Sequence, residues 1–386
     1  MKKSTFKTIA LIGLCLSLGV TSCTDEDDDT DPIQNNGGNT VTTPATYEFT
    51  RNGLSTVSYS GQTDRLNQVA EMKSYIQTAA DNKTKISEQA LIDMFENTSG
   101  NGNGNFSFSS TKQLSDKTFD TDRQEFVAMF DRAADASDSG IASIAAKNGT
   151  AGILTRSNGS VVLLDSNGHE FTQELEKGLM GATFYHQIVN VYLTDDKIGS
   201  TINNTDLETG KNYTAMEHHM DEAFGYYGAP VGFTSNYSGS ESPRYWASYS
   251  RNFDGITPLI DEIMAPFKRA RQAIVDKRYD VKNSEVIKIN AALEVLIAAT
   301  TIHYINEGLN SPTDADRMHV LSEGYFFLKA LRYSNINNRK LSQAEVNKML
   351  DVDFGNNFWN TTSTGLNAIK TKLSATYELD TVKDQL

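Results

Sequence analysis

The densest group of residues able to bind a metal ion lies at positions 217–222, which read Glu-His-His-Met-Asp-Glu. On an α-helix, residues three or four apart share a face, so Glu222 can meet either His218 or His219 at one point. Imidazole nitrogen combined with carboxylate oxygen suits zinc or iron, and such a site takes three or four ligands. Consecutive helical residues point roughly 100° apart, so we expect only one of the two histidines to share a ligand with Glu222. Glu217 supplies a further carboxylate.

A similar pair occurs later in the chain, at His319 and Glu323. In both segments the histidine and the glutamate are four residues apart, and a small residue and then aromatic residues follow. This similarity between 218–226 and 319–327 suggests a duplicated helical unit and a second metal site. The alternative is that each pair forms an ordinary hydrogen bond on a helix surface or in the core, without a metal.

Motifs of known enzyme classes are missing or incomplete. Residues 169–173 begin like the His-Glu-x-x-His helix of zinc peptidases, but Gln173 stands where the second histidine is required. The sequence also lacks the Gly-x-Ser-x-Gly nucleophile motif, the phosphate-binding Gly-Lys-Ser/Thr loop and the dinucleotide fingerprint. These absences favour a binding protein over an enzyme. The run Tyr-Trp-Ala-Ser-Tyr at 245–249 is suited either to stacking on a sugar or to core packing.

The elements that position these residues are mainly helical. Apolar residues recur every three or four positions from Leu66 to Ala80, after an expected cap at Thr63. The same periodicity predicts helices at 86–96, 122–135, 169–194, 213–227, 256–279, 284–308, 313–333, 341–350 and 363–377. We expect Pro266 to kink the helix around it or to begin a new one.

One region is predicted to form strands. Residues 151–155 and 160–165 flank a turn that contains Asn158-Gly159, which is typical of a β-hairpin, whereas the glycine- and asparagine-rich residues 100–105 indicate a loop. The predicted fold is therefore all-α in the main, with two helical bundles related by duplication and one small β-hairpin. Residues 47–386 would form this domain, with halves at 47–235 and 236–386.

The first 22 residues are typical of a lipoprotein signal peptide. Three lysines precede an apolar run from Ile9 to Val20, which is too short to span a bilayer, and the segment ends Val-Thr-Ser-Cys23. This ending resembles a bacterial lipobox, in which the cysteine is lipidated and becomes the first residue of the mature chain. An ordinary secretory signal is the alternative. Cys15 would be removed with the signal, so no disulfide can form within the mature chain.

Residues 23–46 have the composition of an acidic, polar and disordered tether. Six acids follow Cys23 closely, and such a run resembles the surface-export signal of Bacteroidetes lipoproteins. We therefore predict a protein anchored to the outer membrane by lipid on Cys23 and facing the cell surface, or alternatively the periplasm. The whole chain has 49 acidic and 35 basic residues and a net charge of −14. No nucleic-acid partner is expected, because phosphate binding needs clustered lysine and arginine.

A resemblance to a known family adds to this interpretation. His219-Met-Asp-Glu222, followed by aromatic residues and glycine, resembles the His-x-x-Glu motif of imelysin-like proteins. Residues 177–182 together with 217–230 are closer still to an uncharacterised Bacteroidetes lipoprotein family that resembles imelysin. The resemblance covers roughly residues 47–386, although Glu217 stands where the imelysin motif usually has glycine.

The resemblance implies an exported double helical bundle linked to iron uptake, with His219 and Glu222 as metal ligands. The leading hypothesis is thus a lipoprotein that binds iron, zinc or a metal complex beside an outer-membrane transport partner, with His218, Glu217 and His186 as weaker candidate ligands. A metal-independent lipoprotein that recognises a glycan or a protein is the second hypothesis. A metallopeptidase is the third, because peptidase activity was proposed for the founding family.

Overall fold

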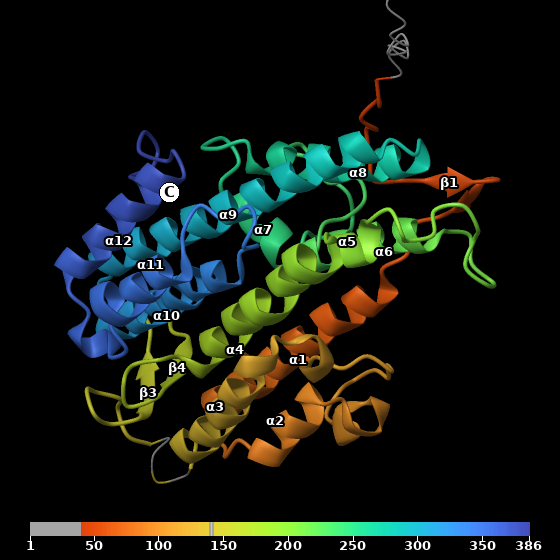
Figure 1. The fold of residues 1–386 in the computed structure, drawn as a ribbon. Helices are drawn as coiled ribbons and strands as arrows, with labels where there is room; N and C mark the ends of the chain where they lie inside the picture. Colours follow the sequence, from red (N-terminus) through yellow and green to blue (C-terminus); the bar gives the residue numbers. More distant parts are fainter. Residues whose placement is uncertain (1–39, 139, 141–142) are drawn as a thin grey trace, which may run out of the picture. The chain divides into compact units, whose positions relative to one another are not determined.

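The longest helix, α9 (Tyr279–Asn310), is the centre of the helical packing. Its 32 residues extend about 48 Å, and fully buried apolar side chains such as Ile289 and Ile297 recur along it. In the computed structural model, α9 packs against α8 (Leu259–Val275), α10 (Asp314–Ala330) and α12 (Ser363–Thr376) (Figure 1). Three helices therefore cover a helix that is apolar on most of its circumference.

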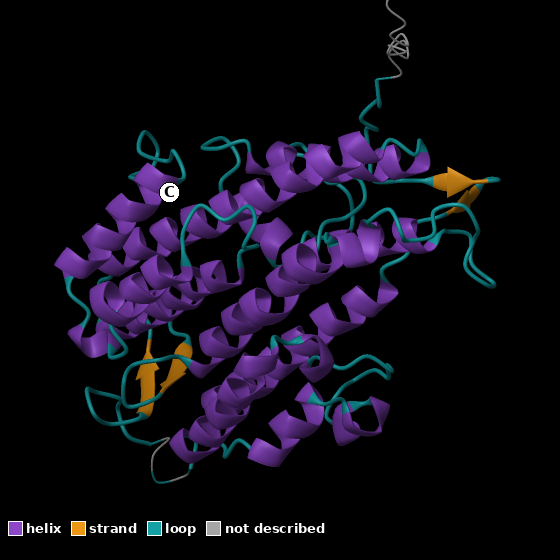
Figure 2. Cartoon of the chain, viewed as in Figure 1, coloured by secondary structure: helices purple, strands orange, loops and turns teal. Residues whose placement is uncertain are grey.

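The structure describes residues 40–138, 140 and 143–386, and residues 41–386 form one compact unit. The predicted signal peptide, Cys23 and most of the predicted tether lie outside these residues. Within the described part the fold is mainly helical, as predicted, with twelve α-helices and two sheets of two short strands each (Figure 2). Duplication of the unit, and its division into halves, stay predictions.

A second group of helices contains the segments of interest for function. The helix α1 (Ser60–Asn82) packs against α4 (Phe171–Leu179) and α6 (Ala215–Tyr227), and α6 also contacts α8. The predicted helix at 169–194 is helical from Phe171 to Tyr192, with α4 followed by π-helical turns at Met180–Tyr185 and Ile188–Tyr192. The remaining α-helices are α2 (Glu88–Phe95), α3 (Arg123–Ala136), α5 (Asp195–Ile198), α7 (Trp246–Asn252) and α11 (Gln343–Lys348).

The predicted hairpin is confirmed as β3 (Gly152–Thr155) and β4 (Val161–Leu164), which pair antiparallel. The prediction of a single hairpin is wrong, since β1 (Thr50–Arg51) and β2 (Leu54–Ser55) form another. Asn52 and Gly53 connect these strands, and both have positive φ angles, of 54° and 77°. An Asn-Gly step with two positive φ angles is the preferred two-residue hairpin turn, so the sequence did contain this signal.

Two helix starts differ from the predictions. Pro266 does not begin a new helix, because α8 continues through it from Leu259 to Val275. The helix α1 begins at Ser60 without a side-chain cap, three residues before the cap expected at Thr63. In both helices, packing of the apolar face against neighbouring helices outweighs the local sequence signals.

Among the described residues, one helix is long and apolar enough to cross a membrane by length and composition, and it is α9. Two thirds (67%) of its most apolar window is buried inside the unit. This burial is what a core helix of a folded domain shows, and the contacts with α8, α10 and α12 account for the apolar surface.

The central position of α9 leads to a prediction about stability. Ile297→Ala removes fully buried methyl groups and should lower the free energy of unfolding by about 2–5 kcal/mol, because a cavity remains. Ile287→Ala on the same helix is the matched control, since Ile287 is 55% exposed and its loss should cost less than about 0.5 kcal/mol. Urea unfolding of both variants measures the difference, and equal losses would contradict a core role for α9.

Candidate functional site

The run Glu-His-His-Met-Asp-Glu lies in the first half of α6, and the start of this helix is strongly specified. The Thr214 side chain accepts a hydrogen bond from the Glu217 backbone N–H, and the Glu217 carboxylate accepts one from the Thr214 N–H at 2.8 Å. This reciprocal capping box fixes the first turn. The helix ends before Gly228, whose φ of 83° suits a left-handed C-cap. The six residues are thus held on a helix with two well-defined ends.

The acids of the run divide between two faces of α6. Glu217 and Asp221 are fully buried and face Arg271 of α8, which has no exposed side-chain surface. The Nη1 of Arg271 lies 3.1 Å from Glu217 Oε1, and its Nε lies 3.0 Å from Asp221 Oδ1. Glu217, predicted as a weaker metal ligand, is therefore engaged in an internal ion pair on the inward face.

The buried acids also bind the chain segment at 47–58, which we call the N-terminal strap. The Tyr47 hydroxyl donates to Asp221 at 3.0 Å, the Ser58 N–H donates to the same carboxylate at 3.1 Å, and Arg51 Nη2 donates to Glu217 at 3.0 Å. Every carboxylate oxygen of the two acids thus accepts at least one hydrogen bond. The strap is held against α6 by charge as well as by packing.

Protonation of the buried acids follows from these contacts. Burial raises the pKa of Asp221 to about 6, although Arg271 acts in the opposite direction. Burial also acts to raise the pKa of Glu217, but the Arg271 guanidinium outweighs it and the pKa is lowered. Both acids are therefore ionised at neutral pH, and the inward face of α6 is an ionic contact with two carboxylates.

The two histidines of the run share one arrangement. The Nδ1 of His218 lies 3.0 Å from the Ser58 carbonyl oxygen, and the Nδ1 of His219 lies 2.6 Å from the Lys197 carbonyl oxygen. A carbonyl oxygen only accepts, so Nδ1–H donates in both rings, and in the neutral form of each ring Nε2 keeps its lone pair. Backbone carbonyls hold the Nδ1–H of metal-binding histidines in the same way. Burial also lowers the pKa of His219 and so favours its neutral form.

Glu222 is the acid of the run that these histidines approach. Its Oε1 lies 4.0 Å from His218 Nε2, and it accepts hydrogen bonds from Gln62 at 3.1 Å and from the Tyr192 hydroxyl at 3.2 Å. The sequence resemblance pairs Glu222 with His219, whereas the contact in the structure is with His218, one helical turn before Glu222. The histidine rings lie at an angle of 26° with centroids 6.5 Å apart.

These side chains are close together but not arranged as a metal centre. No group of three histidine, cysteine or acidic residues has metal-binding geometry in the described residues. Rotation of the Glu222 side chain away from Gln62 and Tyr192 is needed before its carboxylate can complete a site with a histidine. Gln62 and Tyr192 come from distant segments, and no sequence pattern points to them as neighbours of α6.

Cationic and phenolic groups lie beside Glu222. Lys117 Nζ is 5.8 Å from the centre of the Tyr192 ring, and burial and the nearby Arg65 lower its pKa. The hydroxyl of Tyr226 is buried without a hydrogen-bond partner in the described part of the chain, and Arg65 and Glu222 both act on it electrostatically. The surroundings of Glu222 thus combine its own negative charge with two positive charges.

The predicted second site, His319 and Glu323, has different neighbours. His319 Nδ1 lies 2.6 Å from Glu170 Oε2, and its Nε2 lies 3.6 Å from Glu323 Oε2. The Lys177 ammonium lies 3.2 Å from the same Glu323 carboxylate. Burial acts to raise the pKa of Glu170, but the His319 imidazole outweighs it and lowers the pKa. The second pair is therefore part of a buried ionic network in which a lysine of the chain supplies the cation.

Two further predicted groups serve packing. His186 lies against Phe119, with ring centres 4.9 Å apart, and burial lowers its pKa. In the aromatic run at 245–249, Trp246 is fully buried and donates from Nε1 to the Met180 carbonyl at 3.1 Å. This tryptophan is a core residue, and it offers no ring surface for a sugar.

Comparison with known proteins gives one match. A family model described as a domain of unknown function (DUF4856) matches residues 44–380. No curated protein and no solved structure matches the chain.

Removal of the buried arginine tests the inward face of α6. Arg271→Met removes the cation that Glu217 and Asp221 share and leaves Asp221 without an ion-pair partner in the core, so it should lower the free energy of unfolding by about 3–5 kcal/mol. The triple variant with Glu217→Gln and Asp221→Asn should recover part of that loss, because it removes the acids that Arg271 had compensated. Urea unfolding at pH 7 measures both.

Lys372→Met is the control for the arginine substitution. It breaks the half-exposed ion pair with Glu345 at 2.8 Å and should cost less than about 1 kcal/mol. A loss of that small size in Arg271→Met would show that the buried network does not hold the unit together.

Proposed function

The chain belongs to the family described as a domain of unknown function (DUF4856), and from this premise we propose that it binds a metal ion or metal complex through α6. His219 and Glu222 are the proposed ligands, with His218 as the third. One observation carries the proposal: the Nδ1 of each histidine lies against a backbone carbonyl, so Nε2 is the nitrogen left to coordinate, and His218 Nε2 lies 4.0 Å from Glu222 Oε1.

The arrangement supports metal binding in preference to a structural pair. An imidazole that serves only to hold α6 needs a single partner, and the carbonyls of Ser58 and Lys197 already supply it. Each ring still has a nitrogen able to coordinate, and burial lowers the pKa of His219 and so favours the neutral form that binds a metal. Two nitrogens and one carboxylate oxygen form a ligand set that suits zinc or iron(II) and leaves positions open for water or a chelating molecule.

A place in iron uptake is the finer proposal. The likeness of residues 219–222 to the imelysin motif supports it, as does the predicted export of the chain by a lipoprotein signal. In this proposal lipid on Cys23 anchors the unit to the outer membrane, and the unit hands its metal to a transport protein in that membrane. The imelysin-like relationship and an origin in Bacteroidetes belong to the same proposal.

Metal binding by the purified unit tests the first step. Calorimetric titration of metal-free protein with Zn²⁺, and with Fe²⁺ under anaerobic conditions, should give one binding event per chain. His219→Ala combined with Glu222→Ala should weaken it at least a hundredfold, because two of three ligands are lost. Affinity should also fall from pH 7.5 to pH 5.5, as the imidazoles become protonated.

The control for this titration is His303→Ala combined with Glu307→Ala. These residues form another pair four apart on a helix, with His303 Nε2 and Glu307 Oε1 3.6 Å apart and both side chains partly exposed. The control variant should bind metal as the parent does. Absence of binding by the parent, or equal loss in both variants, would refute a metal site on α6.

The lipid anchor is tested with Cys23→Ala in cells that process lipoproteins. The parent should fractionate with the outer membrane and carry a lipid mass on its first residue, whereas the variant should be soluble. Cys15→Ala is the control, because this residue would be removed with the signal and its loss should change neither result. A parent that is soluble and free of lipid would support the ordinary secretory signal.

A further inference from the structure

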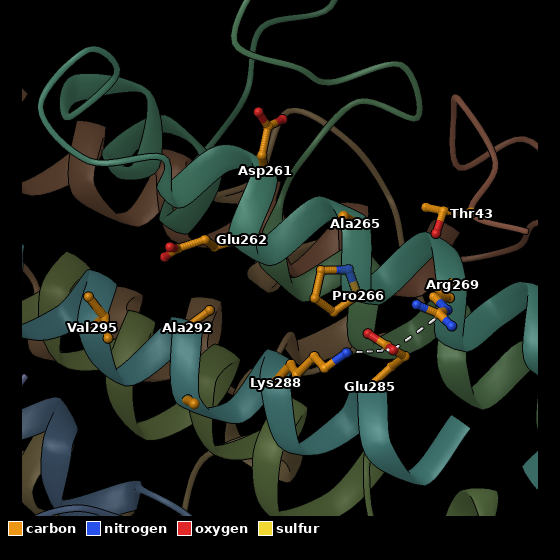
Figure 3. A pocket seen from close by; sticks show the side chains of 11 residues that line it. Thr43, Asp261, Glu262, Ala265, Pro266, Arg269, Glu285, Lys288, Ala292 and Val295 are labelled. Atoms are coloured by element: carbon orange, nitrogen blue, oxygen red, sulfur yellow. Dashed lines mark hydrogen bonds and ion pairs between the residues drawn. The ribbon is translucent and has the colours of Figure 1, made fainter. Parts of the chain in front are cut away.

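A groove of about 600 Å³ lies between α8 and α9, on elements that contribute nothing to the proposed metal ligands (Figure 3). Its volume is within the range of small-molecule sites, roughly 300–1,000 Å³. Its wall is formed by small or compact apolar side chains, which leave room between the two helices. They are Ala265, Pro266, Ala291, Ala292 and Val295.

One end of the groove is closed by ion pairs. The Glu285 carboxylate, of which 4% is exposed, accepts a hydrogen bond from Lys288 Nζ at 2.8 Å. Arg269 Nε lies 3.7 Å from the same carboxylate. Figure 3 shows these three side chains together below Pro266. Their charges are already compensated by one another, so this end offers no acid free to hold a ligand.

The other end carries acids without such compensation. Asp261 and Glu262 line the groove in the first turn of α8, and neither forms an ion pair of 4.0 Å or less with any described cationic side chain. In Figure 3 the Glu262 carboxylate extends toward the side of Ala292 and Val295. Asp261 acts electrostatically on Lys268, but the Lys268 ammonium donates its hydrogen bond to the Ala45 carbonyl, at 3.0 Å.

Pro266 adds an acceptor of a different kind. It lies inside α8 and has no N–H, so the carbonyl of Glu262, four residues earlier, receives no helical hydrogen bond from it. Glu262 and Pro266 both line the groove, so this carbonyl belongs to a residue of its wall. The acidic end thus has a carboxylate and a carbonyl that Pro266 does not bond, and both only accept hydrogen bonds.

From these observations we propose that the groove binds a small organic cation, a primary ammonium group attached to an apolar body. The ammonium donates to the Glu262 carboxylate and to the Glu262 carbonyl, and Asp261 adds negative charge at the same end. The apolar body lies on Pro266, Ala292 and Val295. An ammonium group has three donors and no acceptor, which complements an end that has acceptors only.

Titration with three ligands of equal size tests the charge in the proposal. By calorimetry or protein NMR, 4-phenylbutylamine should bind at least tenfold more tightly than 4-phenylbutanol, and 4-phenylbutyrate should bind least. Shifted resonances should come from α8 and α9. Equal binding of the amine and the alcohol, or shifts confined to other helices, would overturn the proposal.

Three variants test the residues, each checked for an unchanged fold by circular dichroism. Glu262→Gln should weaken amine binding at least tenfold, and Ala292→Phe should abolish it by filling the groove. Glu307→Gln is the control, because this acid is exposed on α9 outside the groove and its loss should have no effect. Unchanged binding in both groove variants would refute the site.

Pro266→Ala separates the carbonyl from the carboxylate. The alanine N–H can bond the Glu262 carbonyl, so the thermal midpoint should rise while amine affinity falls. A packing change alone would alter the affinities for the amine and the alcohol equally, and that result would contradict the role of the carbonyl. Metal binding on α6 should be the same in every groove variant, because the two sites share no residue.

Discussion

The ion pair of Arg271 with Glu217 and Asp221 is the contact on which the arrangement around α6 depends. All three side chains are removed from water, which is unfavourable unless each charge is fully compensated. Compensation requires α6, α8 and the N-terminal strap to be in place together, since Tyr47 and Ser58 supply further donors to Asp221. The same contact fixes the rotation of α6 about its axis and thereby the positions of both histidines. The buried ion pair thus engages Glu217 and Asp221 and leaves Glu222 as the acid of the run that does not contact Arg271.

The helical class and most helix positions followed from the sequence, because apolar periodicity records which face is buried. The site was predictable only in part. Glu222 and the histidines were identified from their spacing. Glu217, in contrast, pairs with Arg271, which lies 54 residues later, and no local sequence pattern predicts that ion pair. Gln62 and Tyr192 contact Glu222 from other helices for the same reason. Spacing along one helix gives the face of a residue, whereas its partners depend on tertiary packing.

The two His–Glu pairs have the same spacing in the sequence but different contacts in the structure. His218–Glu222 and His319–Glu323 have the same spacing, yet Glu222 accepts hydrogen bonds from neutral groups and Glu323 binds the Lys177 ammonium. His218 has its Nδ1 on a carbonyl, while His319 has its Nδ1 on a second carboxylate. A lysine inside the second cluster lies 3.2 Å from Glu323, whereas Glu222 forms no ion pair of 4.0 Å or less with any described lysine or arginine. The two pairs therefore share a sequence pattern but differ in their contacts, because the groups that bind the two glutamates differ in charge.

The position of Tyr47 has a mechanical consequence. Any tension that reaches the folded unit from residues 1–40 first meets the residues before the strap, where the Ala45 carbonyl accepts a hydrogen bond from Lys268 at 3.0 Å. It then meets the strap itself, where the Tyr47 ring stacks on Phe224 at 3.8 Å and the Tyr47 N–H binds the Val231 carbonyl at 2.7 Å. Because the strap also binds the buried acids of α6, such a pull would load the helix that carries the histidines.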